Sequence, residues 1–140
     1  MFMEHIEPGT TLRTFATLRI ISKTLNPQDI TTKLKLTPSE TKDVGDLRGR
    51  SGHWPHGYWE LSSREQVDSI DLADHLLWLV TTVEPSTAEI QQLHLEGLRI
   101  DIFCFWETSS SQGGITISPD LWRRIGVLNL IVGVDIYFAT

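Results

Sequence analysis

Apolar residues recur along the chain with two different periods, and these periods predict where strands and helices lie. Alternating apolar positions with β-branched and aromatic residues predict strands over 11–22, 58–62, 98–107 and 130–138. Apolar residues at helical spacing predict helices over about 26–36, 69–83, 86–96 and 118–128. The predicted order is therefore strand–helix–strand, one or two helices, and again strand–helix–strand.

Two of these helices are predicted to begin with the same local signal, a capping residue followed by proline. The pairs are Asn26–Pro27 and Ser118–Pro119. The capping side chain can accept a hydrogen bond from a free backbone amide, and proline suits the first helical position because it lacks an N–H. Since the signal follows a strand in both halves, we interpret the chain as a weak pseudo-repeat of two strand–helix–strand units.

Two such units predict an α+β fold of the ferredoxin-like sandwich type. We expect a mostly antiparallel four-stranded sheet in the order 4-1-3-2, with helices on one face. Residues 69–96 are then an extra helical insertion between the halves. A chain of 140 residues can build a core without disulfides or metals. We expect one domain over residues 11–140 and a flexible N-terminal arm over residues 1–10.

Several stretches of the chain carry a family resemblance. They are LNPQDITTKLKLTPSE at 25–40, GYWELSS at 57–63, ISPDL at 117–121 and VDIY at 134–137. Their order resembles an uncharacterised bacterial family, domain of unknown function 4279, over roughly residues 12–138. The resemblance implies a fold and no catalytic residues, because the family has no established activity. Small acidic proteins of this kind occur among candidates for immunity to bacterial toxins, which slightly favours a binding role.

Composition and charge narrow the class of protein. The net charge is −6, with 40% hydrophobic and 21% charged residues, as in a soluble globular protein. A duplex nucleic-acid partner is disfavoured because such binders need a clustered basic surface. We see neither a signal peptide nor an apolar run long enough to span a membrane. The single Cys104 cannot form an internal disulfide. We therefore expect a reduced, cytoplasmic and bacterial setting, with no cofactor.

Strand alternation separates two faces of the predicted sheet, because side chains two residues apart point the same way. The apolar set belongs under the helices: Leu18, Ile20, Trp59, Leu61, Ile100, Ile102, Cys104, Val132, Val134, Ile136 and Phe138. The opposite set is Arg19, Tyr58, Glu60, Arg99, Asp101, Asp135 and Tyr137.

In the order 4-1-3-2 the strand of Arg19 lies between those of Asp101 and Asp135, so we expect Arg19 to pair with one of these carboxylates. The polar face is then either a ligand-, partner- or homodimer-binding surface, or a solvated face with cross-strand ion pairs.

The loop at residues 45–57 is the predicted working surface. It concentrates Arg48, Arg50, His53, Trp54 and His56 among several glycines. Trp and Arg dominate binding hot spots, and the arginine fork suits carboxylate or phosphate. The alternative is a mobile loop whose Trp54 folds back, with Trp59, onto the sheet edge.

Other candidate chemistry is weaker. His53 and His56 suggest a metal, but zinc needs three or four ligands and no third one is nearby, so we expect no metal site. Cys104 is expected to be buried and inert, and His75 and His94 to be solvated.

No catalytic set emerges, so an enzyme is disfavoured. The first functional hypothesis is a non-enzymatic cytoplasmic protein-interaction module, with an immunity-type role as one form of it. The second is a small-molecule or anion-binding module in which Arg48, Arg50 and His53 grip the ligand. A hydrolase that uses the loop histidines is the weakest hypothesis.

Overall fold

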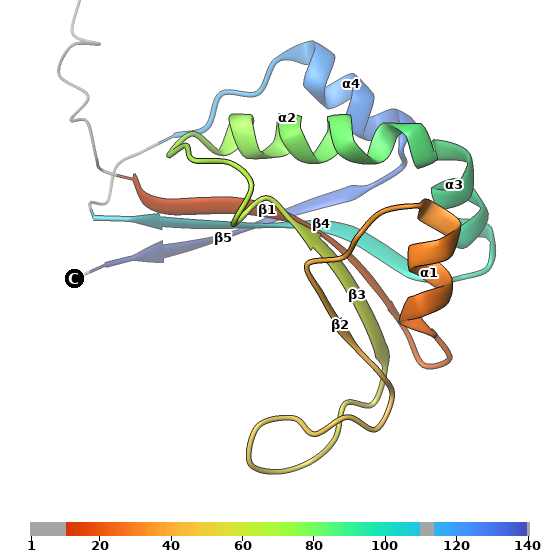
Figure 1. The fold of residues 1–140 in the computed structure, drawn as a ribbon. Coiled ribbons are helices and arrows are strands. Elements are labelled where there is room, and N and C mark those ends of the chain that lie inside the picture. Colours follow the sequence, from red (N-terminus) through yellow and green to blue (C-terminus); the bar gives the residue numbers. More distant parts are fainter. Residues whose placement is uncertain (1–10, 110–113, 140) are drawn as a thin grey trace, which may run out of the picture.

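The computed structural model describes residues 11–109 and 114–139 (Figure 1). The arm predicted over residues 1–10 lies outside the described residues. In chain order the elements are β1 (Thr11–Ser22), α1 (Pro27–Leu34), β2 (Glu40–Lys42), β3 (Gly57–Ser62), α2 (Leu72–Val83), the 3₁₀ turn η2 (Glu84–Ser86), α3 (Thr87–Leu95), β4 (Arg99–Thr108), α4 (Pro119–Val127) and β5 (Ile131–Phe138).

The strands form one five-stranded sheet in the order β2-β3-β1-β4-β5. β1 pairs antiparallel with both β3 and β4, and β2 pairs antiparallel with β3, whereas β4 and β5 run parallel. The predicted mixture of helices with a mostly antiparallel sheet is confirmed. The predicted count of four strands and the order 4-1-3-2 are wrong.

The missed strand β2 explains one part of the error in strand order, the place of the strand of Tyr58. The other part is that β5 pairs with β4, whereas the predicted order placed it beside β1. β2 and β1 both pair antiparallel with β3, so they run parallel to each other with β3 between them. The strand that α1 leads into is therefore β2, whereas the sequence pattern assigned that place to the strand of Tyr58. β2 has only three residues, Glu-Thr-Lys, and no apolar alternation from which it could be predicted.

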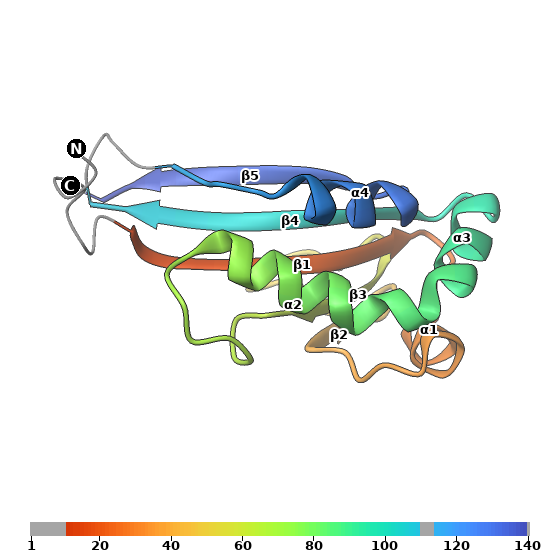
Figure 2. The same ribbon diagram turned by 90° about the horizontal axis from the view of Figure 1, so that it is seen from above.

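The helices cover one face of the sheet and leave the other face open (Figures 1 and 2). Leu18 and Ile20 from β1, Trp59 from β3 and Ile102 from β4 point toward the helices and are at most 1% exposed. The helices contribute Ile30, Leu34, Leu76, Leu79, Val80, Ile90, Leu93, Leu121 and Ile125 to the same core. The prediction that Trp59 and Leu61 face the helices, with Tyr58 and Glu60 on the other side, is confirmed.

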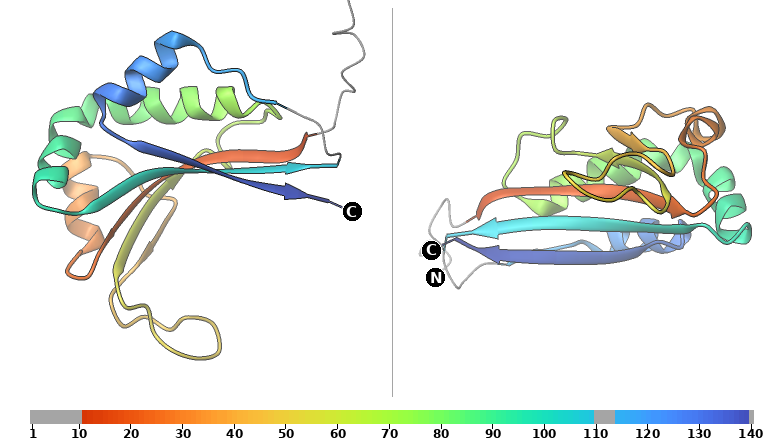
Figure 3. Two further views of the ribbon diagram at one scale, coloured as in Figure 1. Left: turned by 180° about the vertical axis from the view of Figure 1, so that it is seen from behind. Right: turned by 90° about the horizontal axis from the view of Figure 1, so that it is seen from below.

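None of the helices in the described part of the chain lies on the opposite sheet face (Figure 3). We call it the open face. Strand register places the following residues on it: Phe15, Thr17, Arg19, Ile21, Tyr58, Glu60, Ser62, Arg99, Asp101, Phe103, Phe105, Ile131, Gly133, Asp135 and Tyr137.

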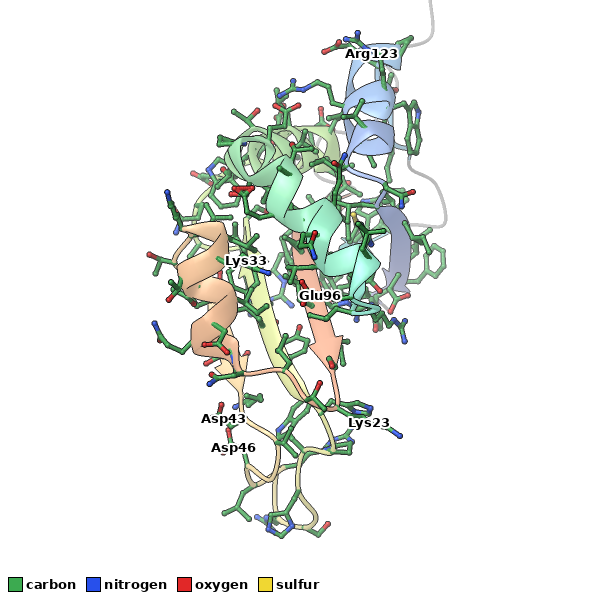
Figure 4. The ribbon with its side chains drawn as sticks, turned by 90° about the vertical axis from the view of Figure 1, so that its right-hand side faces the viewer. Lys23, Lys33, Asp43, Asp46, Glu96 and Arg123 are labelled. Carbon is green, nitrogen blue, oxygen red and sulfur yellow. The ribbon has the colours of Figure 1, made fainter. Side chains whose placement is uncertain are left out.

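The predicted helix caps are present. The Asn26 side chain accepts a hydrogen bond from the backbone N of Gln28 at 3.0 Å, and Ser118 accepts one from the backbone N of Leu121 at 3.1 Å. At one end of the sheet α1 lies beside α3, where Lys33 Nζ lies 3.3 Å from Glu96 Oε2 (Figure 4). Local capping thus sets where helices begin, while contacts between helices set how they pack.

Three of the four β5 positions expected under the helices are exposed, while the fourth, Val132, is partly buried against the core. Val134, Ile136 and Phe138 are 38%, 46% and 60% exposed. β5 lies at the sheet edge, where α4 is the nearest helix (Figure 2). A helix rises about 1.5 Å per residue and a strand about 3.3 Å. The nine residues of α4 therefore cover only about half the length of the eight-residue β5.

His75 is buried, contrary to the prediction that it is solvated. Its side chain is on the inner stripe of α2 and is 1% exposed. Its Nε2 donates to the Ser69 carbonyl at 2.8 Å, and its Nδ1 accepts from Ser63 Oγ at 2.6 Å. Ser63 Oγ in turn accepts from the Ala16 backbone N at 2.9 Å. Burial is tolerated because both ring nitrogens have partners.

His94 is only partly exposed, and its Nε2 lies 3.3 Å from the Leu128 carbonyl oxygen.

Candidate functional site

The segment between β2 and β3 forms a long hairpin that projects from the sheet (Figures 1 and 3). We call residues 43–56 the β2–β3 hairpin. Its two arms are held together by backbone hydrogen bonds from Gly45 N to Trp54 O at 2.8 Å and from Trp54 N to Asp46 O at 2.7 Å. Gly45 and Gly52 have φ angles of 93° and 78°, which L-residues with side chains rarely adopt. The glycines therefore let the chain turn sharply within this segment.

The base of the hairpin is fixed by two close contacts. The backbone N of Asp43 donates to the Asp46 carboxylate at 2.7 Å, and both residues lie where the hairpin leaves the sheet (Figure 4). On the other arm, a Cβ on Gly57 would lie 2.2 Å from the Leu25 carbonyl oxygen. Only glycine therefore allows β3 to pass this close to the chain after β1.

A cavity of about 610 Å³ lies between the β2–β3 hairpin and the open face. We call it the loop–sheet cleft. The residues that line it come from both regions: Arg19, Ile21, Glu40, Lys42, Arg48, Trp54, Pro55, His56, Tyr58, Glu60 and Arg99. The two surfaces that the sequence suggested separately, the loop and the polar sheet face, therefore meet in one site.

Arg19 and Asp101 form the polar centre of the open face. Arg19 Nε and Nη2 donate to the two Asp101 carboxylate oxygens at 2.8 and 2.9 Å, and the guanidinium lies 4.8 Å from the Phe103 ring centroid. The hydrogen bond to Asp101 raises the pKa of Arg19 further above its ordinary value. The predicted pairing of Arg19 with one of two carboxylates is confirmed for Asp101. Asp135 lies on β5, which β4 separates from β1.

A second polar pair lies beside it. The Tyr58 hydroxyl donates to Glu60 Oε1 at 2.6 Å. Burial, and then the hydrogen bond to the Glu60 carboxylate, raise the pKa of Tyr58 well above its ordinary value. Tyr58 therefore keeps its proton and stays neutral, and its hydroxyl is a hydrogen-bond donor to the Glu60 carboxylate. Lys42 Nζ lies 3.2 Å from Glu40 Oε1, so these two charges on β2 also compensate each other.

Aromatic contacts continue from the sheet onto the hairpin. The rings of Trp54 and Tyr58 stack with centroids 5.9 Å apart and an interplanar angle of 27°. The Arg48 guanidinium lies 5.2 Å from the Trp54 ring centroid, within reach of a cation–π interaction. These contacts hold the hairpin's Arg48 and Trp54 beside the open face.

A second hollow of about 440 Å³ extends the cleft along the open face. It shares Arg19 and Tyr58 with the loop–sheet cleft and continues to Phe15 and Arg64. The Arg64 guanidinium lies 5.4 Å from the Phe15 ring centroid, and Phe15 stacks on Phe105 at 5.1 Å. Sequence reasoning missed Phe15 and Arg64. For Phe15 the signal was available, because it lies on the same strand as Arg19 with even spacing.

Comparison with protein families decides where the chain belongs. One family model matches residues 10–139, which is nearly the whole chain. The chain belongs to the family described as a domain of unknown function (DUF4279). The family resemblance found in the sequence is thereby confirmed. The comparisons found no curated protein and no solved structure that matches this chain.

In this DUF4279 member the predicted binding residues divide into three groups. Those that line the loop–sheet cleft are Arg19, Arg48, Trp54 and His56. Asp101 holds Arg19 in place from the neighbouring strand. Those that do not line the cleft are Arg50, His53 and Asp135.

The residues that could bind metal or act as nucleophiles are dispersed. Within residues 11–109 and 114–139 no group of three or more His, Cys, Asp or Glu side chains could hold a metal ion. Cys104 is buried as predicted, and burial raises the pKa of its thiol to about 12. Over the same residues, no helix combines the length and the apolar character needed to cross a membrane.

Proposed function

We propose that this protein is a binding module whose loop–sheet cleft takes a small anionic ligand with an aromatic part. The observation that carries the proposal is the meeting of cationic and aromatic side chains from the hairpin and the sheet in one cavity of about 610 Å³. Small-molecule sites in proteins have volumes of about 300–1,000 Å³ and combine apolar walls with a few polar groups. The cleft has this size and this mixture.

The charges that line the cleft favour an anion, although the whole chain is acidic. Arg19 is compensated by Asp101, and Lys42 by Glu40. In the described part of the chain, the one carboxylate that Arg99 approaches is the already paired Asp101, at 3.6 Å, and the Arg99 side chain is 71% exposed. Within the described residues Arg48 contacts a ring and no carboxylate. Arg48 and Arg99 are therefore the cations available to a carboxylate or phosphate.

The aromatic walls favour a ligand with a flat apolar part. Trp54 stacks on Tyr58, and both line the cleft together with Ile21 and Pro55. An aromatic ring inserted here would contact Trp54 and lie within reach of Arg48. Such offset stacking adds about 0.5–1.5 kcal/mol to simple burial of apolar area.

A role in binding without catalysis agrees with the hydrogen bonds that the ionisable groups of the cleft already make. The Tyr58 hydroxyl is held by Glu60, and Arg19 by Asp101. The Ser63–His75 hydrogen bond resembles a nucleophile–base pair, but the two residues are 0% and 1% exposed and neither lines the cleft. The pair joins α2 to the sheet.

A protein-interaction role, including one of immunity type, is the second candidate. The observation that favours it is the exposed surface of the β2–β3 hairpin outside the cleft. Leu47 is 74% and Val44 51% exposed, and Arg50 and His53 are exposed nearby. Exposed apolar and arginine side chains together on a projecting segment are typical of protein interfaces.

Thermal denaturation with matched small probes tests the first candidate. Phenyl phosphate should raise the melting temperature, inorganic phosphate should raise it less, and phenol should leave it unchanged. A ligand at a hundredfold excess over its dissociation constant stabilises by about 2.7 kcal/mol. No shift with phenyl phosphate or other aromatic anions contradicts the proposal.

Two double variants within the same hairpin show where phenyl phosphate binds when it raises the melting temperature. Arg48→Ala with Trp54→Ala should abolish the shift, because both side chains line the cleft. Arg50→Ala with His53→Ala should retain it, because these residues lie outside the cleft. The reverse result would place the site at the hairpin tip. If aromatic anions have no effect but a purified protein partner binds and loses affinity in the Arg50/His53 variant, the second candidate is favoured.

A further inference from the structure

The outer edge of β5 is the longest exposed apolar strand edge among the described residues. β5 has eight residues, and among residues 11–109 and 114–139 its one partner strand is β4. Ile131 is 76% exposed, and Val134, Ile136 and Phe138 are between 38% and 60% exposed. An unpaired edge presents a row of free backbone N–H and C=O groups that can pair with another strand.

The two edges of the sheet differ in how they are protected. The β2 edge has three residues, two of which are the charged Glu40 and Lys42. Short length and charged side chains are the common means by which proteins prevent edge pairing. β5 carries no lysine, no proline and no bulge, and Asp135 is its single charge. Of the two sheet edges in the described part of the chain, the β5 edge is therefore the one open to strand pairing.

We propose that two copies of this chain pair through β5, antiparallel to each other across a twofold axis. The two sheets then join into one continuous sheet with β5 at its centre. The outer edges of that sheet are the two protected β2 strands, so the assembly closes as a dimer and does not extend into a filament. This inference is independent of the proposed anion site, because none of the residues that line the cleft belongs to β5.

The sequence of β5 selects one register. A twofold axis perpendicular to the sheet must pass midway between the two copies of one residue, because opposite side chains have to share a face. The midpoint of β5 lies between Val134 and Asp135. Centring on Asp135 would bring two carboxylates opposite each other, which is destabilising. Centring on Val134 sets Val132 opposite Ile136, Ile131 opposite Tyr137, and Gly133 opposite Asp135.

The helix layer beside this edge also has exposed apolar side chains. Trp122 and Val127 of α4 are 52% and 60% exposed, and α4 lies on the β4–β5 side of the sheet (Figure 2). In the paired arrangement the α4 helices of the two copies lie on the same side of the joined sheet. Exposed apolar groups on both the strand and the nearby helix fit burial against a second copy.

The molecular mass in solution, measured by light scattering and sedimentation, tests the proposal. Wild type should have twice the 15.9 kDa mass of one chain. Ile136→Lys places a charge on the pairing edge and should give a monomer. Leu95→Lys is the matched control, because Leu95 is 83% exposed on α3 at the other end of the molecule, and this variant should remain a dimer. Circular dichroism should show that both variants are folded.

Disulfide trapping tests the register. In the Val134-centred pair the two Val134 Cα atoms lie about 4.5–5.5 Å apart, within the range of a disulfide. Val134→Cys should therefore cross-link two chains under mild oxidation, while the native Cys104 is buried. Asp135→Cys should not, because its two copies are then diagonal neighbours about 7–8 Å apart.

Two outcomes overturn the inference. One is a wild-type monomer at every concentration measured. The other is a dimer that persists in Ile136→Lys and does not cross-link through Val134→Cys, which would assign dimerisation to another surface, such as the open face. Because thermal stabilisation by phenyl phosphate is measured separately, failure of the dimer and failure of the cleft are distinguishable.

Discussion

The covered face and the open face of this sheet are built from neighbouring residues of the same strands, yet different forces act on them. On β3, Trp59 is fully buried under the helices, while Tyr58 beside it faces the cleft. On β1, Ile20 is in the core and Arg19 pairs with Asp101. Strand alternation thus separates the apolar residues of the core from the polar and aromatic residues that face the cleft.

β5 shows what happens when the separation is incomplete. Its alternation is as regular as that of β1, but its inner side has only part of a helix above it. Apolar side chains such as Ile136 are consequently exposed on a strand edge. An apolar pattern therefore marks positions that are suited to burial. Whether these positions are buried within one chain depends on the elements that lie beside the strand.

The largest expected loss of stability comes from a substitution on the covered face. Trp59→Ala removes a fully buried side chain and its hydrogen bond to Thr31, and should lower the free energy of unfolding by about 3–5 kcal/mol in urea titrations. Trp54→Ala is the matched control on the cleft side and should cost about 1 kcal/mol, since it loses mainly the stack on Tyr58. Equal losses for the two variants would mean that the faces are not separated.

The next effect concerns the buried polar link between β1, β3 and α2. Ser63→Ala leaves His75 Nδ1 and the Ala16 amide without their partner, and should cost about 2 kcal/mol. His53→Ala, on the exposed hairpin, should change stability by less than about 0.5 kcal/mol. Chemical denaturation measures both. If Ser63→Ala does not change stability, another group must form the hydrogen bonds to His75 Nδ1 and to the Ala16 backbone N.

A smaller effect is expected for the ion pair on the open face. Arg19→Ala should cost about 1.5 kcal/mol, at the low end for charged hydrogen bonds, because Arg99 remains within 3.6 Å of Asp101. Thermal unfolding at low and high salt gives the measurement. The double variant Arg19→Ala with Asp101→Ala should recover part of the loss, since it leaves no unpaired carboxylate. A double variant that is no more stable than the single one would argue against the pairing.

The smallest effect is a pH dependence within the helix layer. The hydrogen bond from Arg124 holds the pKa of Glu84 below its ordinary value of 4.5. A lowered carboxylate pKa stabilises the fold above the unfolded-state pKa, and this stabilisation is lost as the pH falls through the folded-state pKa. The urea concentration at the unfolding midpoint should therefore decrease as the pH is lowered below about 4.5. The decrease should be slightly smaller in Glu84→Gln. An identical acid response in that variant would assign the loss to other carboxylates.

Local signals and alternation predicted much of this protein correctly. The caps Asn26 and Ser118, the inner positions Trp59 and Leu61, and the Arg19–Asp101 pair all follow from contacts that residues make with near neighbours or across adjacent strands. The caps and the inner positions depend on local geometry, so one sequence is enough to predict them. The Arg19–Asp101 pair joins residues far apart in the sequence, and its prediction also required the two strands to be neighbours. The loop was likewise identified from its composition, and four of the predicted binding residues line the cleft.

What the sequence alone determined is the set of elements apart from β2, the faces of the predicted strands, and the concentration of Arg, His and Trp in one segment. Tertiary structure alone decided the strand order, the burial of His75 and the exposure of Ile136. β2 forms because the hairpin places three polar residues beside β3. No alternation of apolar and polar residues predicts such a strand. Which elements become neighbours depends on packing between residues that are far apart in the sequence. The free energy of this packing depends on many positions together, so no single position of the chain reveals it.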